Sequence, residues 1–253
     1  MRPLCVTVLL TTTLAACGSG GGAGPDAGGP DAADAADAAN DGDPGAVPLA
    51  GFGGITGMCG VLGAAELDGT TPLWFGGELT FADRYDDPAE RDQLTPGGLA
   101  IVSVPNAGGS SVYSEVFAYE WLARCELAEL IKTETDVVYD VEGKKIDLLV
   151  GIDGRKVGVS VTRAVTFPFG DPYTLTAATT LFERKLDDIQ LATAQVSAAD
   201  RWSKQMLVTL AYDAQHAAVA MEAWAALDAA TRDDTLLVTV VTSGDDVFIY
   251  TDQ

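Results

Sequence analysis

Residues 144–165, KKIDLLVGIDGRKVGVSVTRAV, decide the fold of this chain. They contain two apolar runs, 146–151 and 156–162, joined by the tetrapeptide GIDG. An Asp-Gly pair between two short apolar runs is typical of a tight antiparallel hairpin. We therefore predict two neighbouring strands here, with Asp147 at the start of the first.

The surrounding sequence predicts an alternation of helices and strands. Before the hairpin, apolar residues recur at three or four positions from Ser114 onward, which predicts a helix with Glu115 in its first turn and Ser114 as its N-cap. Continuous apolar runs downstream indicate strands covered on both faces. The expected elements are a strand at 135–141, the hairpin, a helix at 172–196, a strand at 205–212, a helix at 213–230 and strands at 235–242 and 246–251.

The segment before Ser114 has a different texture. Residues 49–113 are rich in glycine and proline and contain the short apolar pieces 58–62, 73–81 and 98–104. This pattern predicts short strands and loops. The fold class that follows is α/β (α+β), a mixed central sheet flanked by helices, with the core order αβββαβαβ over 114–253.

The N-terminus predicts export and anchoring. Residues 1–16 combine Arg2 with a short apolar run, as in a secretory signal peptide. The motif Leu-Ala-Ala-Cys ending at Cys17 resembles a bacterial lipobox, in which that cysteine becomes the lipid-bearing N-terminus. Residues 17–48 are almost entirely Gly, Ala, Asp and Pro, so they cannot bury enough apolar surface to fold and should form an extended tether. The expected location is the cell envelope, at the outer membrane or cell surface, with the membrane as partner through Cys17.

The net charge and the cysteine content restrict the possible partners and the possible disulfides of the chain. The chain has 37 acidic and 15 basic residues among 253, a formal net charge of −22 at pH 7, which disfavours nucleic acid as a partner. Beyond the signal peptide and Cys17, only Cys59 and Cys125 remain, and they can either pair or stay as buried thiols.

Two resemblances follow from these features. The tether composition resembles that of myxobacterial lipoproteins. The order of helix, three strands, helix, strand, helix and strand, over about 114–251, resembles the PD-(D/E)XK nuclease fold, which includes restriction endonucleases.

The resemblance to that nuclease family implies a set of site residues. Asp147 stands where the family has its first metal-binding acid, and Glu115 matches an additional glutamate on the preceding helix. Both are then candidate ligands for Mg²⁺, a cation that prefers carboxylate oxygens. Where the family has an acid and a lysine on the next strand, this chain has Ser160 and Thr162. Lys185, on the following helix, is the candidate replacement for the lysine, with Arg163 as the nearer alternative.

The function expected from these residues is that of a membrane-anchored lipoprotein with a nuclease-like domain that is catalytically weak or inactive, because two carboxylates without a third should bind Mg²⁺ weakly. The alternative is a metal-dependent nuclease using Asp147, Glu115 and Lys185. Each residue also has a structural interpretation: Asp147 as a strand start, Glu115 as a favourable charge at a helix start, and Lys185 as a surface ion-pair partner.

Overall fold

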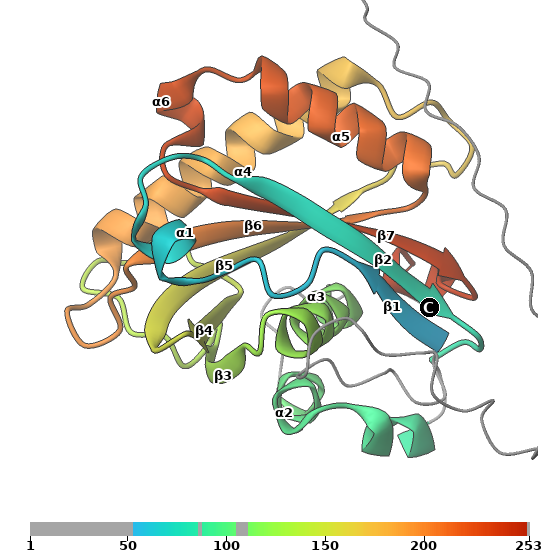
Figure 1. Ribbon diagram of the computed structural model, residues 1–253, viewed down its shortest axis with the longest axis horizontal. Helices are drawn as coiled ribbons and strands as arrows, with labels where there is room; N and C mark the ends of the chain where they lie inside the picture. Colours follow the sequence, from blue (N-terminus) through green and yellow to red (C-terminus); the bar gives the residue numbers. More distant parts are fainter. Residues whose placement is uncertain (1–52, 86–87, 105–110, 252–253) are drawn as a thin grey trace, which may run out of the picture. The chain divides into compact units, whose positions relative to one another are not determined.

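The computed structural model describes residues 53–85, 88–104 and 111–251. Cys17, the signal peptide and the tether predicted at 17–48 lie outside the described residues. The described part is built on a seven-stranded mixed sheet in the order β1-β2-β7-β6-β5-β4-β3 (Figure 1). Its strands are β1 Gly53–Gly57, β2 Trp74–Phe81, β3 Glu129–Thr133, β4 Leu148–Ile152, β5 Arg155–Ala164, β6 Lys204–Ala211 and β7 Leu236–Gly244.

The hairpin expected from residues 144–165 is present. β4 and β5 pair antiparallel from Ile152↔Arg155 to Leu148↔Val159. The two residues of the turn, Asp153 and Gly154, both have positive φ, at 47° and 73°. Such a turn matches the twist of the strands it joins, which explains the Asp-Gly sequence.

Strand direction changes across the sheet. β3, β4 and β5 form an antiparallel meander, whereas β5, β6 and β7 are parallel to one another. Parallel neighbours need a crossover, and two helices provide it: α4 Leu175–Gln195 between β5 and β6, and α5 Ala214–Ala226 between β6 and β7. The expected mixed sheet with flanking helices is thus confirmed.

Helices cover both faces of the sheet. α3 Val112–Cys125 packs on one face, where its Phe117 and Trp121 share a core with Val159 of β5. α4 and α5 pack on the other face, where Phe182 and Trp224 share a core with β6 and β7. The shorter helices are α1 Ala64–Asp68, η1 Pro88–Gln93, α2 Pro96–Ser103, α6 Ala229–Arg232 and η2 Val247–Ile249.

α2 corrects the strand expected at 98–104. Thr95 caps this helix by accepting a hydrogen bond from the Gly98 N–H (3.2 Å), and Pro96 begins it. The helix lies close against α3, because a Cβ at Gly98 would come within 2.1 Å of Glu120 Oε1. A strand would have lost both the cap and this close approach.

The first strand of the meander is also displaced from its expected position at 135–141. α3 ends at Cys125, and Leu127 then takes a left-handed conformation (φ 53°), so Leu130 and Ile131 lie on β3 instead of continuing the helix. In the expected segment, Tyr139 makes an isolated bridge to Val196. The apolar spacing of 127–131 suited a helix equally well, and the sequence contains no strong stop signal at Cys125.

The last expected strand, 246–251, is instead the short 3₁₀ helix η2. Phe248 and Tyr250 are two positions apart and both buried, the spacing expected of a strand. They are held by a turn, in which Thr242 Oγ1 donates to Asp246 Oδ2 and lies 2.7 Å from the Tyr250 hydroxyl. The chain therefore folds back under the end of β7.

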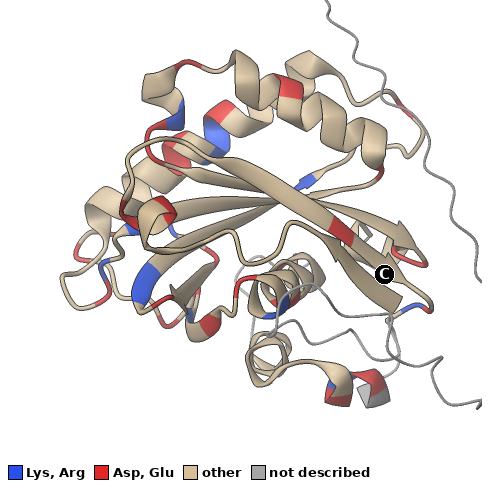
Figure 2. Cartoon of the chain, in the orientation of Figure 1, with Lys and Arg blue, Asp and Glu red and all other residues tan. Residues whose placement is uncertain are grey.

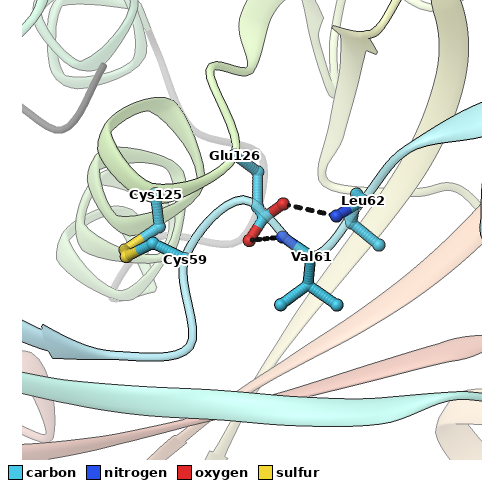
Figure 3. The surroundings of a disulfide bond; sticks show 5 residues. All are labelled: Cys59, Val61, Leu62, Cys125 and Glu126. Carbon is cyan, nitrogen blue, oxygen red and sulfur yellow. Dashed lines mark hydrogen bonds between the residues drawn. A yellow bond between two sulfur atoms is a disulfide. The ribbon is translucent and has the colours of Figure 1, made fainter. Parts of the chain in front are cut away.

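Cys59 and Cys125 form a disulfide, which settles the alternative left open by the sequence. Beside it, the buried Glu126 carboxylate accepts hydrogen bonds from the backbone N–H groups of Val61 (3.2 Å) and Leu62 (2.8 Å) (Figure 3). The disulfide and this carboxylate together fasten the segment after β1 to the end of α3.

Within the described residues, no helix combines the length and the apolar character needed to cross a bilayer.

Candidate functional site

Asp147 lies immediately before β4, where it extends the contact between β4 and β5. Its N–H donates to the Val159 carbonyl (3.0 Å), and its Oδ2 accepts from the Val161 N–H (2.6 Å). The second bond reaches two residues beyond Val159 of the last β4–β5 residue pair, Leu148↔Val159. The carboxylate thus satisfies a backbone donor that the strand ladder no longer reaches.

Lys185 approaches Asp147 from α4. Burial raises the pKa of Asp147, whereas the Lys185 ammonium and the Val161 N–H act in the opposite direction. Lys185 is half-buried, and its charge also lowers the pKa of Glu134. Two of the predicted site residues are therefore electrostatic neighbours.

Glu134 is a further member of this cluster that sequence reasoning missed. Burial raises its pKa, the Asp147 charge raises it further, and Lys145 and Lys185 lower it. The register explains the proximity, since Thr133 of β3 pairs antiparallel with Leu148 of β4, and Glu134 and Asp147 are the next residues beyond this pair. The strand predicted at 135–141 begins after Glu134, so the sequence did not identify Glu134 as a neighbour of Asp147.

Tyr139 closes the same cluster. Its hydroxyl accepts a hydrogen bond from the Ile146 N–H (3.0 Å). Burial raises the pKa of Tyr139 to about 12, with the charges of Glu134 and Asp147 acting in the same direction. We refer to Glu134, Tyr139, Asp147 and Lys185 as the α4-face cluster.

Glu115 occupies a different setting. It is buried in the first turn of α3, where Ser111 Oγ donates to its carboxylate (2.7 Å). α3 covers the face of the sheet opposite to α4. Among the described residues, the charge that shifts the pKa of Asp147 is that of Lys185, not that of Glu115.

The β5 positions that correspond to the family's acid and lysine carry Ser160 and Thr162, both buried. Arg163, the nearer candidate for a replaced lysine, donates from Nη1 to the Ile249 carbonyl (3.2 Å). It thereby holds the C-terminal segment against the end of β5. Neither β5 position supplies a charged metal ligand.

These contacts limit the chemistry of the site. Among residues 53–85, 88–104 and 111–251, no group of three or more His, Cys, Asp or Glu side chains is arranged to hold a metal ion. The described lysines and arginines are scattered among acidic residues over many elements (Figure 2). The α4-face cluster therefore offers two carboxylates, one ammonium and one phenol, and the Oδ2 atom of Asp147 is already engaged by the Val161 N–H.

Comparison with known proteins does not place the chain in a family. No family model matches it. It is 34% identical over 150 residues to the AAC-rich mRNA clone AAC4 protein of Dictyostelium discoideum, a stretch that covers 57% of this chain and 22% of that protein. The chain thus spans about a fifth of the length of this curated relative.

Among solved structures, Pyrococcus furiosus SfsA in complex with Ca²⁺ aligns with 13% identity and a TM-score of 0.26, over 51% of this chain and 55% of that chain. A TM-score this low supports no argument about fold or chemistry.

Proposed function

We propose that the chain is an envelope lipoprotein whose body keeps a nuclease-like core but performs no metal-dependent hydrolysis. The topology supports the core likeness: an antiparallel meander is followed by a helical crossover to a parallel strand. This is the element order that suggested the PD-(D/E)XK resemblance.

The observation that carries the inactive assignment is the engagement of Asp147. A metal-binding carboxylate needs its oxygens directed to the cation. Asp147 instead accepts the Val161 N–H at 2.6 Å and lies near the Lys185 charge, while Ser160 and Thr162 replace charged groups on β5. The carboxylate then serves to join the start of β4 to β5.

The Cys59–Cys125 disulfide supports export. Disulfides persist in oxidising compartments such as the cell envelope and are rare in reducing cytosol. This agrees with the signal peptide and the lipid-bearing Cys17 predicted from the sequence.

Membrane attachment is tested by fractionating cells that express the whole chain or its Cys17→Ser variant. The unchanged chain should sediment with membranes and carry the mass of the lipid at Cys17, and the variant should lose both. Equal partitioning and equal N-terminal mass in the two chains would overturn the anchor.

Catalysis is tested by incubating the purified chain with DNA or RNA and Mg²⁺ or Mn²⁺. We expect no cleavage above that of an Asp147→Ala variant. Metal-dependent cleavage that disappears in Asp147→Ala and Lys185→Ala, and persists in Lys144→Ala, would overturn the inactive assignment. Lys144 is a suitable control because its side chain is 53% exposed and pairs with Asp188 of α4 (2.9 Å), not with Asp147.

One observation favours the alternative, a nuclease with its lysine on α4. Glu134 supplies a second carboxylate next to Asp147, on the same side as Lys185. In that case the metal ligands would be Glu134 and Asp147, with Glu115 outside the site. Glu134→Gln would then abolish cleavage and Glu115→Gln would not.

A further inference from the structure

One end of the sheet gathers the carboxyl-terminal ends of four strands and the point where the chain enters the body. Phe81 of β2 lies opposite Gly244 of β7, and Ala164 of β5 lies opposite Ala211 of β6. β1 runs in the opposite direction to β2, so its first residue, Gly53, pairs with Phe81. Gly53 therefore lies at this same end, which is on the right in Figure 1.

The same end presents exposed aromatic side chains. Phe167 and Phe169, in the connection from β5 to α4, are 56% and 39% exposed, and their rings lie 4.7 Å apart. Val247, at the start of η2, is 42% exposed. We call the surface formed by Phe167 and Phe169, together with the aliphatic Val247, the aromatic end.

The aromatic end packs on tyrosine rings beneath it. The ring of Phe169 stacks on Tyr212 at 5.3 Å, and Tyr212 packs edge-on against the buried Tyr250. Pairs of this kind hold rings in defined orientations. The exposed rings are thus presented on a fixed base at the end of the central strands.

We propose that the aromatic end rests on the surface of the membrane that carries the lipid anchor. This rests on the proposed lipoprotein function. The occupant is argued from the position of Gly53: the tether predicted by the sequence joins the body at the end of the sheet where the exposed rings lie. Four strand spacings separate β1 from β5, a distance of about 19 Å.

The predicted length of the tether permits this placement. The sequence has 35 residues between Cys17 and Gly53, whereas about six extended residues would span about 19 Å. Aromatic side chains are favoured at the boundary between headgroups and acyl chains. The anchor would keep the body at a high local lipid concentration, which favours contacts that are individually weak.

The charged residues beside the aromatic end predict which lipid headgroups it prefers. The exposed Asp171 and Asp245 lie two residues from Phe169 and Val247, respectively. Arg163, at the end of β5, is engaged with the Ile249 carbonyl. An acidic rim is repelled by anionic headgroups, so the surface should prefer zwitterionic phosphatidylcholine.

The test uses the mature chain from Cys17, coupled through that thiol to a maleimide lipid in phosphatidylcholine vesicles with brominated acyl chains. The chemical coupling makes the result independent of lipidation in the cell. The native tryptophans set the background, and one tryptophan is added by Phe169→Trp or, as control, by Met58→Trp. Met58 is 50% exposed and follows the last residue of β1, at the opposite end of that strand.

We expect quenching of the added tryptophan to be several-fold greater in Phe169→Trp than in Met58→Trp, and to fall when Phe167→Ser is combined with Phe169→Trp. Added anionic lipid should weaken it. Equal quenching at the two positions would overturn the proposal while leaving the anchor intact. An emission spectrum of the Phe169→Trp chain that depends on protein concentration without vesicles would also overturn it, because a second copy would then cover the rings.

Discussion

At the residue scale, Asp147 has a structural role that its position in the sequence does not indicate. Its carboxylate accepts the Val161 N–H where the β4–β5 ladder has ended, and it does so in a buried setting that raises its pKa. A buried carboxylate is costly unless donors and opposite charge compensate for lost solvation. The Val161 N–H and Lys185 provide part of that compensation, and burial outweighs them because the pKa remains raised.

Two substitutions at this position separate the hydrogen bond from the charge. Asp147→Ala leaves the Val161 N–H without its acceptor and should lower the free energy of unfolding by about 1–3 kcal/mol. Asp147→Asn keeps an acceptor oxygen and should cost clearly less. Urea unfolding of both variants near neutral pH measures this, and equal losses would contradict the assigned role of the carboxylate.

The raised pKa of Asp147 also predicts a pH dependence. Above its ordinary value of 3.8, the folded state binds more protons at this carboxyl than the unfolded state does. Its contribution to stability is therefore greatest at low pH and falls as pH rises through the window between 3.8 and the raised folded value. Glu134 acts in the same direction, because burial raises its pKa too.

We therefore expect the free energy of unfolding to fall less steeply with rising pH in Asp147→Asn than in the unchanged chain. Unfolding measured in steps between about pH 4 and about pH 7 tests this slope. A variant with a steeper slope would show that Asp147 has a lowered pKa in the folded protein.

At the scale of elements, β1 depends on a link that is distant in sequence. β1 is short, glycine-rich and at the sheet edge, and its pairing partner is β2. The Cys59–Cys125 disulfide joins positions 66 residues apart and lies directly after this strand. The Glu126 carboxylate fastens the following residues to the same helix end.

Removing the disulfide should lower stability substantially. For a closed loop of this length the chain-entropy estimate is about 4 kcal/mol. We expect the Cys59→Ser/Cys125→Ser chain to unfold at a lower urea concentration and to become more susceptible to proteolysis at β1. Glu126→Gln, which keeps the disulfide, is the matched comparison and should lose less; a double-serine chain as stable as the unchanged one would refute the estimate.

At the scale of the whole molecule, the net negative charge lowers the stability of the folded state. A formal net charge of −22 produces self-repulsion in the folded state. Added salt screens such repulsion, with a Debye length of about 10 Å at 0.1 M.

The melting temperature should therefore rise when NaCl is increased from about 0.02 M to about 0.5 M at neutral pH. The rise should shrink near pH 4, where many carboxyl groups are protonated. Thermal unfolding followed by circular dichroism tests both conditions, and a melting temperature that falls with salt would mean that attractive ion pairs outweigh the repulsion.

Local patterns in the sequence were sufficient for much of this architecture. The Asp-Gly turn predicted the β4–β5 hairpin, and the long amphipathic run predicted α4, because both are specified by residues close together in the chain. The continuous apolar runs predicted β6 and β7, since a strand covered on both faces needs no alternation. The positions of Asp147, immediately before β4, and of Lys185, on α4, followed from these predictions.

Tertiary structure decided what depends on distant contacts. Leu130 became part of β3 because it pairs with Val150 of β4, and Ile131 lies at the irregularity that follows this pair, although the spacing of both residues also suited a helix. That register, in turn, brought Glu134 beside Asp147. The pairing of Cys59 with Cys125 and the turn of 246–251 under β7 likewise arise between segments far apart or by burial against the core. The periodicity of apolar residues predicts which residues are buried. Which residues they pack against depends on the free energy of the whole fold.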